Sequence, residues 1–111
     1  MNELHISTAA QADLLEIKAY IEQEFDNPSA ALAAVRRITN RIRVLRDHAY
    51  IGARLSSIVT IESDYRYLVS EQYLIFYRVH GKDVDIDRIL HGRRDYMRVL
   101  FEDMLPENSE G

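Results

Sequence analysis

Two helical patterns follow each other without a linker and meet at an asparagine–proline step. In the first, apolar residues recur at three- and four-residue spacing up to about Asp26. Asn27 followed by Pro28 is typical of a helix start, because asparagine caps free N–H groups and proline fits the first helical position. A second apolar stripe then runs to about Asp47. Helices joined this closely predict an antiparallel hairpin.

The start and the exposed face of the first helix are also predictable. Thr8 with Gln11 resembles a capping box and places the helix start there. The acidic residues of this segment fall outside the main apolar stripe, so we expect them on the exposed face. They are Asp13, Glu16, Glu22 and Glu24.

Beyond residue 64 the apolar pattern becomes that of strands. Runs of aromatic and β-branched residues predict strands at 65–69, 73–79 and 84–90. Ser70-Glu71 and Gly81-Lys82-Asp83 between these runs are typical of hairpin turns.

Shorter elements complete the prediction. Residues 4–6 indicate a first strand, Ile58-Val59 a weak one, and residues 95–102 a short C-terminal helix. Strands grouped apart from helices indicate the α+β class. We therefore expect a small antiparallel sheet packed against the N-terminal helical hairpin, with its other face left open.

The length of 111 residues fits one domain. We assign this domain to residues 1–103 and expect the acidic tail 104–111 to fray. No apolar run approaches the roughly 20 residues that span a bilayer, and the N-terminus lacks the pattern of a secretory signal. The absence of cysteine is compatible with a reducing compartment, and we expect a cytoplasmic protein without membrane contact.

The sequence predicts neither a cofactor nor a metal ion. Without cysteine there is no thiolate ligand, and His5, His48 and His80 show no metal-ligand spacing and no carboxylate pair that joins them. Glycine-rich phosphate loops are also absent from the sequence. The net charge of −4 argues against a generally basic nucleic-acid binder.

One short segment concentrates chemically useful side chains. His91, Gly92, Arg93 and Arg94 follow the last predicted strand directly, and Tyr96 comes soon after. Arginine binds phosphate or carboxylate in a bidentate way, histidine can act as an acid or base, and tyrosine can stack on a nucleobase. The segment is therefore the main candidate contact for phosphate, nucleic acid or an acidic protein surface.

Arg66 and Arg78, on the predicted strands, are further candidates for such contacts. Structural roles remain open for all of these residues. His91 would then be bonded to a backbone carbonyl, Arg66 and Arg78 would pair with Asp85 or Asp87, and Arg93 and Arg94 would pair with Asp95, Asp85 or the acidic tail.

Three segments carry a resemblance to a known family. They are the strands 65–69 and 73–79, and residues 88–95, which read Arg-Ile-Leu-His-Gly-Arg-Arg-Asp. With the order of elements, they resemble the RelE/ParE superfamily of toxins from type II toxin–antitoxin modules, also called plasmid stabilisation proteins. The resemblance covers about residues 3–101. It implies a microbial-ribonuclease-like fold and a cognate antitoxin that wraps the toxin, in a homodimer or a toxin–antitoxin hetero-oligomer.

The superfamily contains two activities. RelE-like members are ribosome-dependent endoribonucleases that cut mRNA without a metal, whereas ParE-like members inhibit DNA gyrase. Leu74 stands where the nuclease branch has an arginine in the central strand, and Arg94 matches a second arginine after the last strand. The tyrosine-rich central strand and the His-Gly-Arg-Arg-Asp ending are more similar to ParE-like sequences.

The resemblance thus implies a ParE-like toxin that inhibits gyrase and is neutralised by its antitoxin. The alternative is a RelE-like enzyme that acts on ribosome-bound mRNA, with His91 and Arg94 as catalytic residues. A third interpretation is an inactive member kept as an interaction module.

Overall fold

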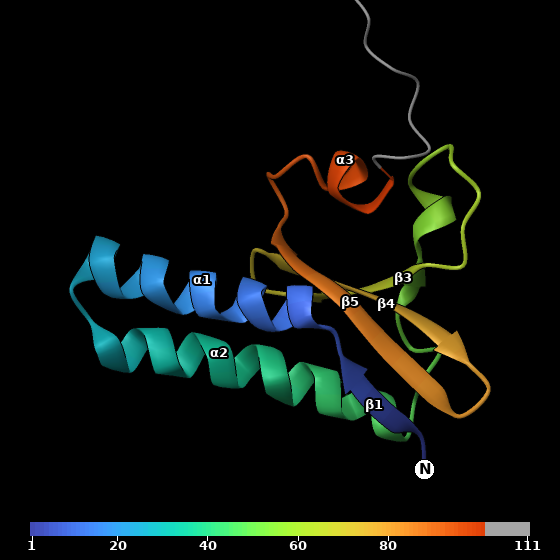
Figure 1. Cartoon of the computed structure of the whole chain (residues 1–111), viewed down its shortest axis with the longest axis horizontal. Coiled ribbons are helices and arrows are strands. Elements are labelled where there is room, and N and C mark those ends of the chain that lie inside the picture. Colours follow the sequence, from blue (N-terminus) through green and yellow to red (C-terminus); the bar gives the residue numbers. More distant parts are fainter. Residues whose placement is uncertain (102–111) are drawn as a thin grey trace, which may run out of the picture.

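The computed structural model describes residues 1–101, so the predicted tail 104–111 and the domain boundary at residue 103 lie outside the described residues. In chain order the elements are β1 (Glu3–Ile6), α1 (Thr8–Phe25), α2 (Pro28–Arg43), the 3₁₀ turn η1 (Val44–Arg46), β2 (Ala53–Arg54), the 3₁₀ turn η2 (Leu55–Ser57), β3 (Arg66–Ser70), β4 (Tyr73–His80), β5 (Asp83–His91) and α3 (Tyr96–Phe101). Figure 1 shows the hairpin of α1 and α2 beside the sheet. Over this described part, no helix has the length and apolar character to cross a membrane.

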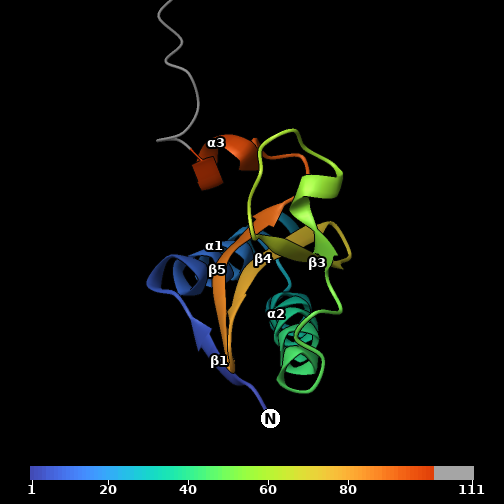
Figure 2. The same ribbon diagram turned by 90° about the vertical axis from the view of Figure 1, so that its right-hand side faces the viewer.

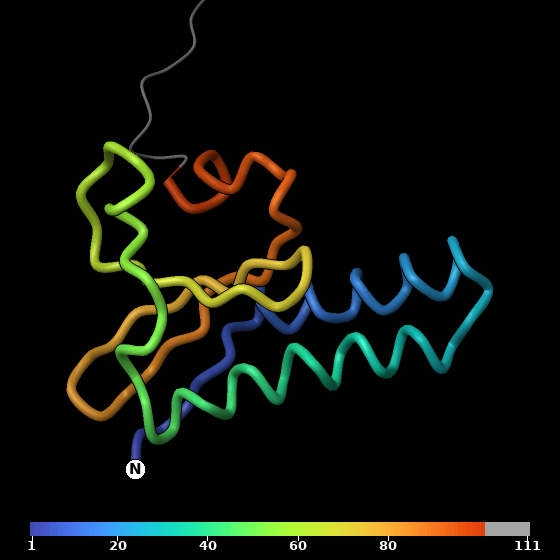
Figure 3. Tube along the Cα trace, turned by 180° about the vertical axis from the view of Figure 1, so that it is seen from behind, coloured from blue at the N-terminus to red at the C-terminus, as the bar shows by residue number. Residues whose placement is uncertain are grey.

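The caps of the two helices show how local sequence sets their starts. The predicted cap at Thr8 is wrong by one position: the side chain of Ser7 accepts a hydrogen bond from the Ala10 N–H, at 2.9 Å. The predicted start of α2 is confirmed, because Asn27 Oδ1 accepts from the Ala30 N–H at 3.0 Å and Pro28 opens the helix. The connected ends of α1 and α2 extend beyond the sheet (Figure 3).

The sheet has the strand order β1-β5-β4-β3-β2. The pairs β5–β4 and β4–β3 are antiparallel, as predicted, and β3–β2 is antiparallel as well, while β1 joins the edge of β5 in parallel. A parallel neighbour needs a long crossover. Here the helical hairpin and strands β2 to β4 form the crossover between β1 and β5. Because this pair is parallel and the other pairs are antiparallel, the sheet is mixed.

The strand predicted at Ile58-Val59 is wrong. The second strand is instead Ala53–Arg54, which pairs with Tyr67 and Arg66 of β3. Ile58 and Val59 both donate their N–H groups to the carbonyl of Leu55, so they close a turn. Their strand propensity is overridden by this local turn, which packs Val59 against the core cluster that contains Leu55.

Both faces of the sheet are covered, which corrects the expectation of one open face. On the hairpin side, Ile38 and Ile42 of α2 pack with Ile75, Tyr77 and Ile86 of the sheet. The opposite face is covered by α3 and by the segment that follows β2 (Figure 2). Its core cluster consists of Leu55, Phe76, Leu90 and Phe101. Successive side chains of β4 and β5 point to opposite faces of the sheet, and both sets include apolar residues. Each strand therefore contributes to both cores.

A buried hydrogen bond ties the loop before β2 to the central strand. The Gly52 N–H donates to the hydroxyl of Tyr77, whose side chain is fully buried, at 2.9 Å. A Cβ at position 52 would lie 2.5 Å from that hydroxyl oxygen and 2.7 Å from the Tyr67 carbonyl oxygen. Only glycine fits this close approach.

We therefore predict that Gly52→Ala lowers the free energy of unfolding by about 2 kcal/mol, because the added methyl group overpacks the core. Gly92→Ala is the matched control, since its new Cβ would meet its nearest neighbour, the Gln72 carbonyl oxygen, at an ordinary 3.5 Å. Chemical denaturation of both variants measures the difference. Equal stabilities would contradict the packing role of Gly52.

Candidate functional site

The chain leaves β5 through a tight turn that presents two arginines. His91 pairs with Tyr73 at the end of the ladder, and the Arg94 N–H donates to the His91 carbonyl at 2.9 Å. The Arg93 N–H donates to His91 Nδ1 at 3.0 Å. Arg93 and Arg94 are both exposed, and within residues 1–101 neither forms an ion pair.

The hydrogen bond to His91 limits what its imidazole can do. The predicted bond to a backbone carbonyl is wrong, because the ring nitrogen Nδ1 accepts from a backbone N–H. The ring also packs edge-on against Tyr73, with 5.6 Å between centroids. The compatible neutral tautomer carries its proton on Nε2, so neither nitrogen offers a free lone pair to a substrate. In this geometry His91 holds the turn and lacks the free acceptor of a general base.

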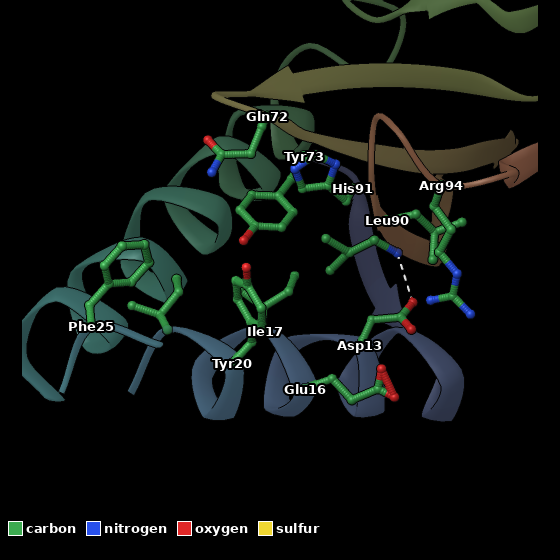
Figure 4. Close-up of a pocket in the computed structure, with 12 residues that line it drawn as sticks. Asp13, Glu16, Ile17, Tyr20, Phe25, Gln72, Tyr73, Leu90, His91 and Arg94 are labelled. Atoms are coloured by element: carbon green, nitrogen blue, oxygen red, sulfur yellow. Dashed lines mark hydrogen bonds between the residues drawn. The ribbon is translucent and has the colours of Figure 1, made fainter. Parts of the chain in front are cut away.

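A groove lies beside this turn (Figure 4). It has a volume of about 340 Å³ and an apolar floor. Arg94 borders one side and Glu16 of α1 another, while Tyr20 and Tyr73 point toward each other across it. Burial and the neighbouring Tyr20 hydroxyl raise the pKa of Tyr73. The lining residues come from α1, from the start of β4 and from the end of β5: Asp13, Glu16, Ile17, Tyr20, Ile21, Phe25, Gln72, Tyr73, Ile89, Leu90, His91 and Arg94.

A partly buried ion pair between Asp13 and Arg88 joins α1 to β5 beside the groove. Asp13, predicted to be exposed, is only 4% exposed. Its two carboxylate oxygens accept from Nε and Nη2 of Arg88, each at 2.8 Å, and Oδ2 also accepts from the Ile89 N–H at 2.9 Å. These bonds to Asp13 raise the pKa of Arg88 against the opposing effect of burial. A bulge in β5, where Phe76 pairs with Arg88 but Tyr77 pairs with Ile86, accompanies this contact.

Arg66 and Arg78 lie far from the turn. Arg78 pairs with Asp87 at 3.0 Å, as the structural alternative predicted, and its guanidinium lies 5.0 Å from the Tyr65 ring centroid. Along β4 it is five residues from Tyr73, the partner of His91, or about 16 Å at the usual strand rise.

The Tyr65 ring beside Arg78 is itself held in place. Its hydroxyl donates to Asp87 at 2.8 Å, and burial together with this carboxylate raises the pKa of Tyr65 to about 12. The predicted ion pair of Arg66 with Asp85 or Asp87 is wrong. Arg66 donates to the Gly52 carbonyl at 2.8 Å and lies over the Tyr50 ring.

Tyr96 is only partly available for stacking. Its ring packs on Phe76 with 5.2 Å between centroids and belongs to the core beneath α3. The structure therefore brings together His91, Arg93 and Arg94, and it places Arg66, Arg78 and Tyr96 in separate structural contacts. The groove residues of α1 had no signal in the sequence apart from the unusual width of the apolar stripe, to which Tyr20 contributes.

Comparison with known families decides the assignment. Residues 4–96 match the family model described as the ParE toxin of the type II toxin–antitoxin system parDE. The chain belongs to the ParE toxin family. A solved structure described as the chromosomal ParDE TA system from P. aeruginosa is similar, with 31% identity, a TM-score of 0.69, and coverage of 82% of this chain and 96% of that one.

YafQ from E. coli strain BL21(DE3) shows 12% identity and a TM-score of 0.49, over 82% of this chain and 93% of that chain. No curated protein matched the sequence. The ParE family confirms the RelE/ParE-like α+β fold that the sequence resemblance implied.

We predict that Asp13→Ala lowers the free energy of unfolding by about 3 to 5 kcal/mol, because it leaves Arg88 and the Ile89 N–H without their buried acceptor. Glu22→Ala on the same helix is the matched control. It removes the more exposed Lys18–Glu22 pair and should cost about 0.5 kcal/mol or less. Urea denaturation of both variants measures this, and similar losses would show that the Asp13 contact is unimportant.

Proposed function

We propose that this ParE-family protein is a toxin that inhibits DNA gyrase and is neutralised by a cognate antitoxin. Membership of the family and the likeness to a chain of the P. aeruginosa ParDE system support both parts of the proposal. The observation that carries it is the turn after β5, where the consecutive residues Arg93 and Arg94 are both exposed and Arg94 borders the groove. Two exposed guanidinium groups without an ion pair among residues 1–101 can bind carboxylates or phosphates on a large target.

The arrangement favours binding over RNA cleavage. Metal-free cleavage needs a base for the 2′-hydroxyl, a cation for the phosphorane and an acid for the leaving oxygen. The cation is available in Arg94, but His91 Nδ1 accepts from the Arg93 N–H and Leu74 replaces an arginine expected in the nuclease branch. Arg66 and Arg78 are engaged elsewhere. The ribosome-dependent nuclease is therefore the alternative that the experiment must test.

The groove supports the antitoxin part of the proposal. Its apolar floor and the exposed rings of Tyr20 and Phe25 form an apolar surface beside charged groups of both signs, Glu16 and Arg94. An amphipathic helix places an apolar face and flanking charges in such a groove. A cognate antitoxin with a segment of this kind would cover the groove together with the neighbouring turn that carries Arg93 and Arg94, the arginine turn. Covering both surfaces would explain neutralisation.

We predict that Arg94→Ala abolishes growth inhibition on induced expression and weakens inhibition of gyrase supercoiling by at least tenfold, or about 1.4 kcal/mol. The fold should be unaffected, since the side chain is exposed. Purified gyrase and plasmid DNA provide the assay.

Arg36→Ala, which removes an exposed arginine of α2, is the control and should remain toxic. A fully toxic Arg94→Ala at equal expression would overturn the site assignment. Codon-specific cuts in translated mRNA with uninhibited gyrase would overturn the gyrase proposal in favour of the nuclease.

For the groove, we predict that Phe25→Arg weakens binding of the antitoxin encoded by the adjacent reading frame by at least about tenfold, because it removes an aromatic anchor. Leu15→Arg is a close control: both side chains lie on α1 and are similarly exposed, at 66% and 68%, but Leu15 does not line the groove. Co-expression and calorimetry measure neutralisation and affinity. Equal affinities for the two variants would place the antitoxin elsewhere.

A further inference from the structure

A second cluster of chemically useful side chains lies at the opposite end of β5 from the arginine turn. Glu3 and His5 of β1 are two residues apart and share one face of that strand. Across the parallel ladder, Glu3 pairs with Asp83 and His5 pairs with Asp85. The register therefore brings an imidazole and several carboxylates from distant parts of the sequence onto one patch. The proposed toxin function uses none of these groups.

The distances in this patch match those between the ligands of one metal ion. His5 Nε2 lies 3.0 Å from Asp83 Oδ1 and 3.7 Å from Glu3 Oε1. All three ligand atoms lie within 4.8 Å of one another. Tetrahedral zinc with bonds of about 2.1 Å separates its ligand atoms by about 3.4 Å, between the two measured distances. Small rotations of exposed side chains would complete the geometry.

The chemistry of the donors selects the class of ion. One imidazole nitrogen with two carboxylate oxygens suits Zn²⁺ and similar transition metals, whereas Mg²⁺ and Ca²⁺ prefer oxygen ligands alone. The local field also favours a cation. The carboxylates of Asp83 and Glu3 both lie within 4 Å of the His5 imidazole, and Asp85 is the ladder partner of His5. Water would occupy the remaining positions, because all three side chains are half exposed or more.

We propose that Glu3, His5 and Asp83 form a surface site for a divalent transition metal such as Zn²⁺. No pattern in the sequence indicates this site, because Asp83 is 78 residues from His5 and the parallel pairing of β1 with β5 brings them together. A bound ion would connect the N-terminal edge strand to the sheet through side chains as well as through the backbone ladder. Its role would be to hold β1 in place.

Titration of the full chain, freed of any affinity tag, with Zn²⁺ tests the site. Isothermal calorimetry should show one ion per chain, and Zn²⁺ should perturb the NMR signals of the His5 ring first. The melting temperature should rise when Zn²⁺ is added and fall back to its metal-free value when a chelator removes the ion. An ion that binds only the folded state stabilises that state. His5→Gln and Asp83→Asn should each weaken binding at least tenfold while their melting temperatures without metal stay close to that of the parent.

His48→Gln and His80→Gln are the controls. His48 is exposed in the loop after η1, and His80 lies on the next strand with its Nε2 3.7 Å from Asp85. Both variants should bind Zn²⁺ within about twofold of the parent. Failure of the parent to bind, binding that persists in His5→Gln, or an equal loss in either control would overturn the proposal. None of these outcomes depends on whether the chain inhibits gyrase.

Discussion

The carboxylate of Asp13 is the contact on which the site geometry depends. It joins α1 to β5 by accepting two hydrogen bonds from Arg88 and one from the Ile89 N–H. A buried carboxylate is costly unless it is fully bonded, and here three donors meet it. Because this contact sets how α1 sits against the end of β5, it also sets the width of the groove and the position of the arginine turn beside it.

Local features of the fold were predictable from the sequence. The start of α2 at Asn27-Pro28 depends on a cap and a proline that are adjacent in the chain, and β4 depends on one continuous apolar run. The wrong predictions have two causes. Some concerned contacts between residues far apart in the sequence, and others depended on which of several local hydrogen bonds forms. Asp13 was predicted to be exposed because its partner Arg88 lies 75 residues away. Ile58 and Val59 have strand-forming side chains, but their backbone groups close a turn on Leu55.

In the candidate site, too, the local cluster was predictable from the sequence and the contacts with other elements were not. The cluster His91, Arg93 and Arg94 was found from sequence because the residues are consecutive and one turn presents them. Arg66 and Arg78 could not be separated from it in advance, since period-two alternation places strand side chains on faces without saying what covers each face. Tyr96 begins α3, and its packing on Phe76 is a contact between residues distant in the sequence. In the structure Arg66 donates to the Gly52 carbonyl in the loop before β2, Arg78 pairs with Asp87 of β5, and Tyr96 packs on Phe76 of β4.

The parallel pairing of β1 with β5 has a consequence for biosynthesis. The ribosome adds Asp83, the ladder partner of Glu3, 80 residues after Glu3 itself. The ladder between β1 and β5 cannot form until β5 has been made, and the turn that follows is complete only once Arg94 has been added. Such non-local pairing forms late and slowly. A newly made chain therefore passes through a period without its finished surface, and a co-translated binding partner has that time to reach it.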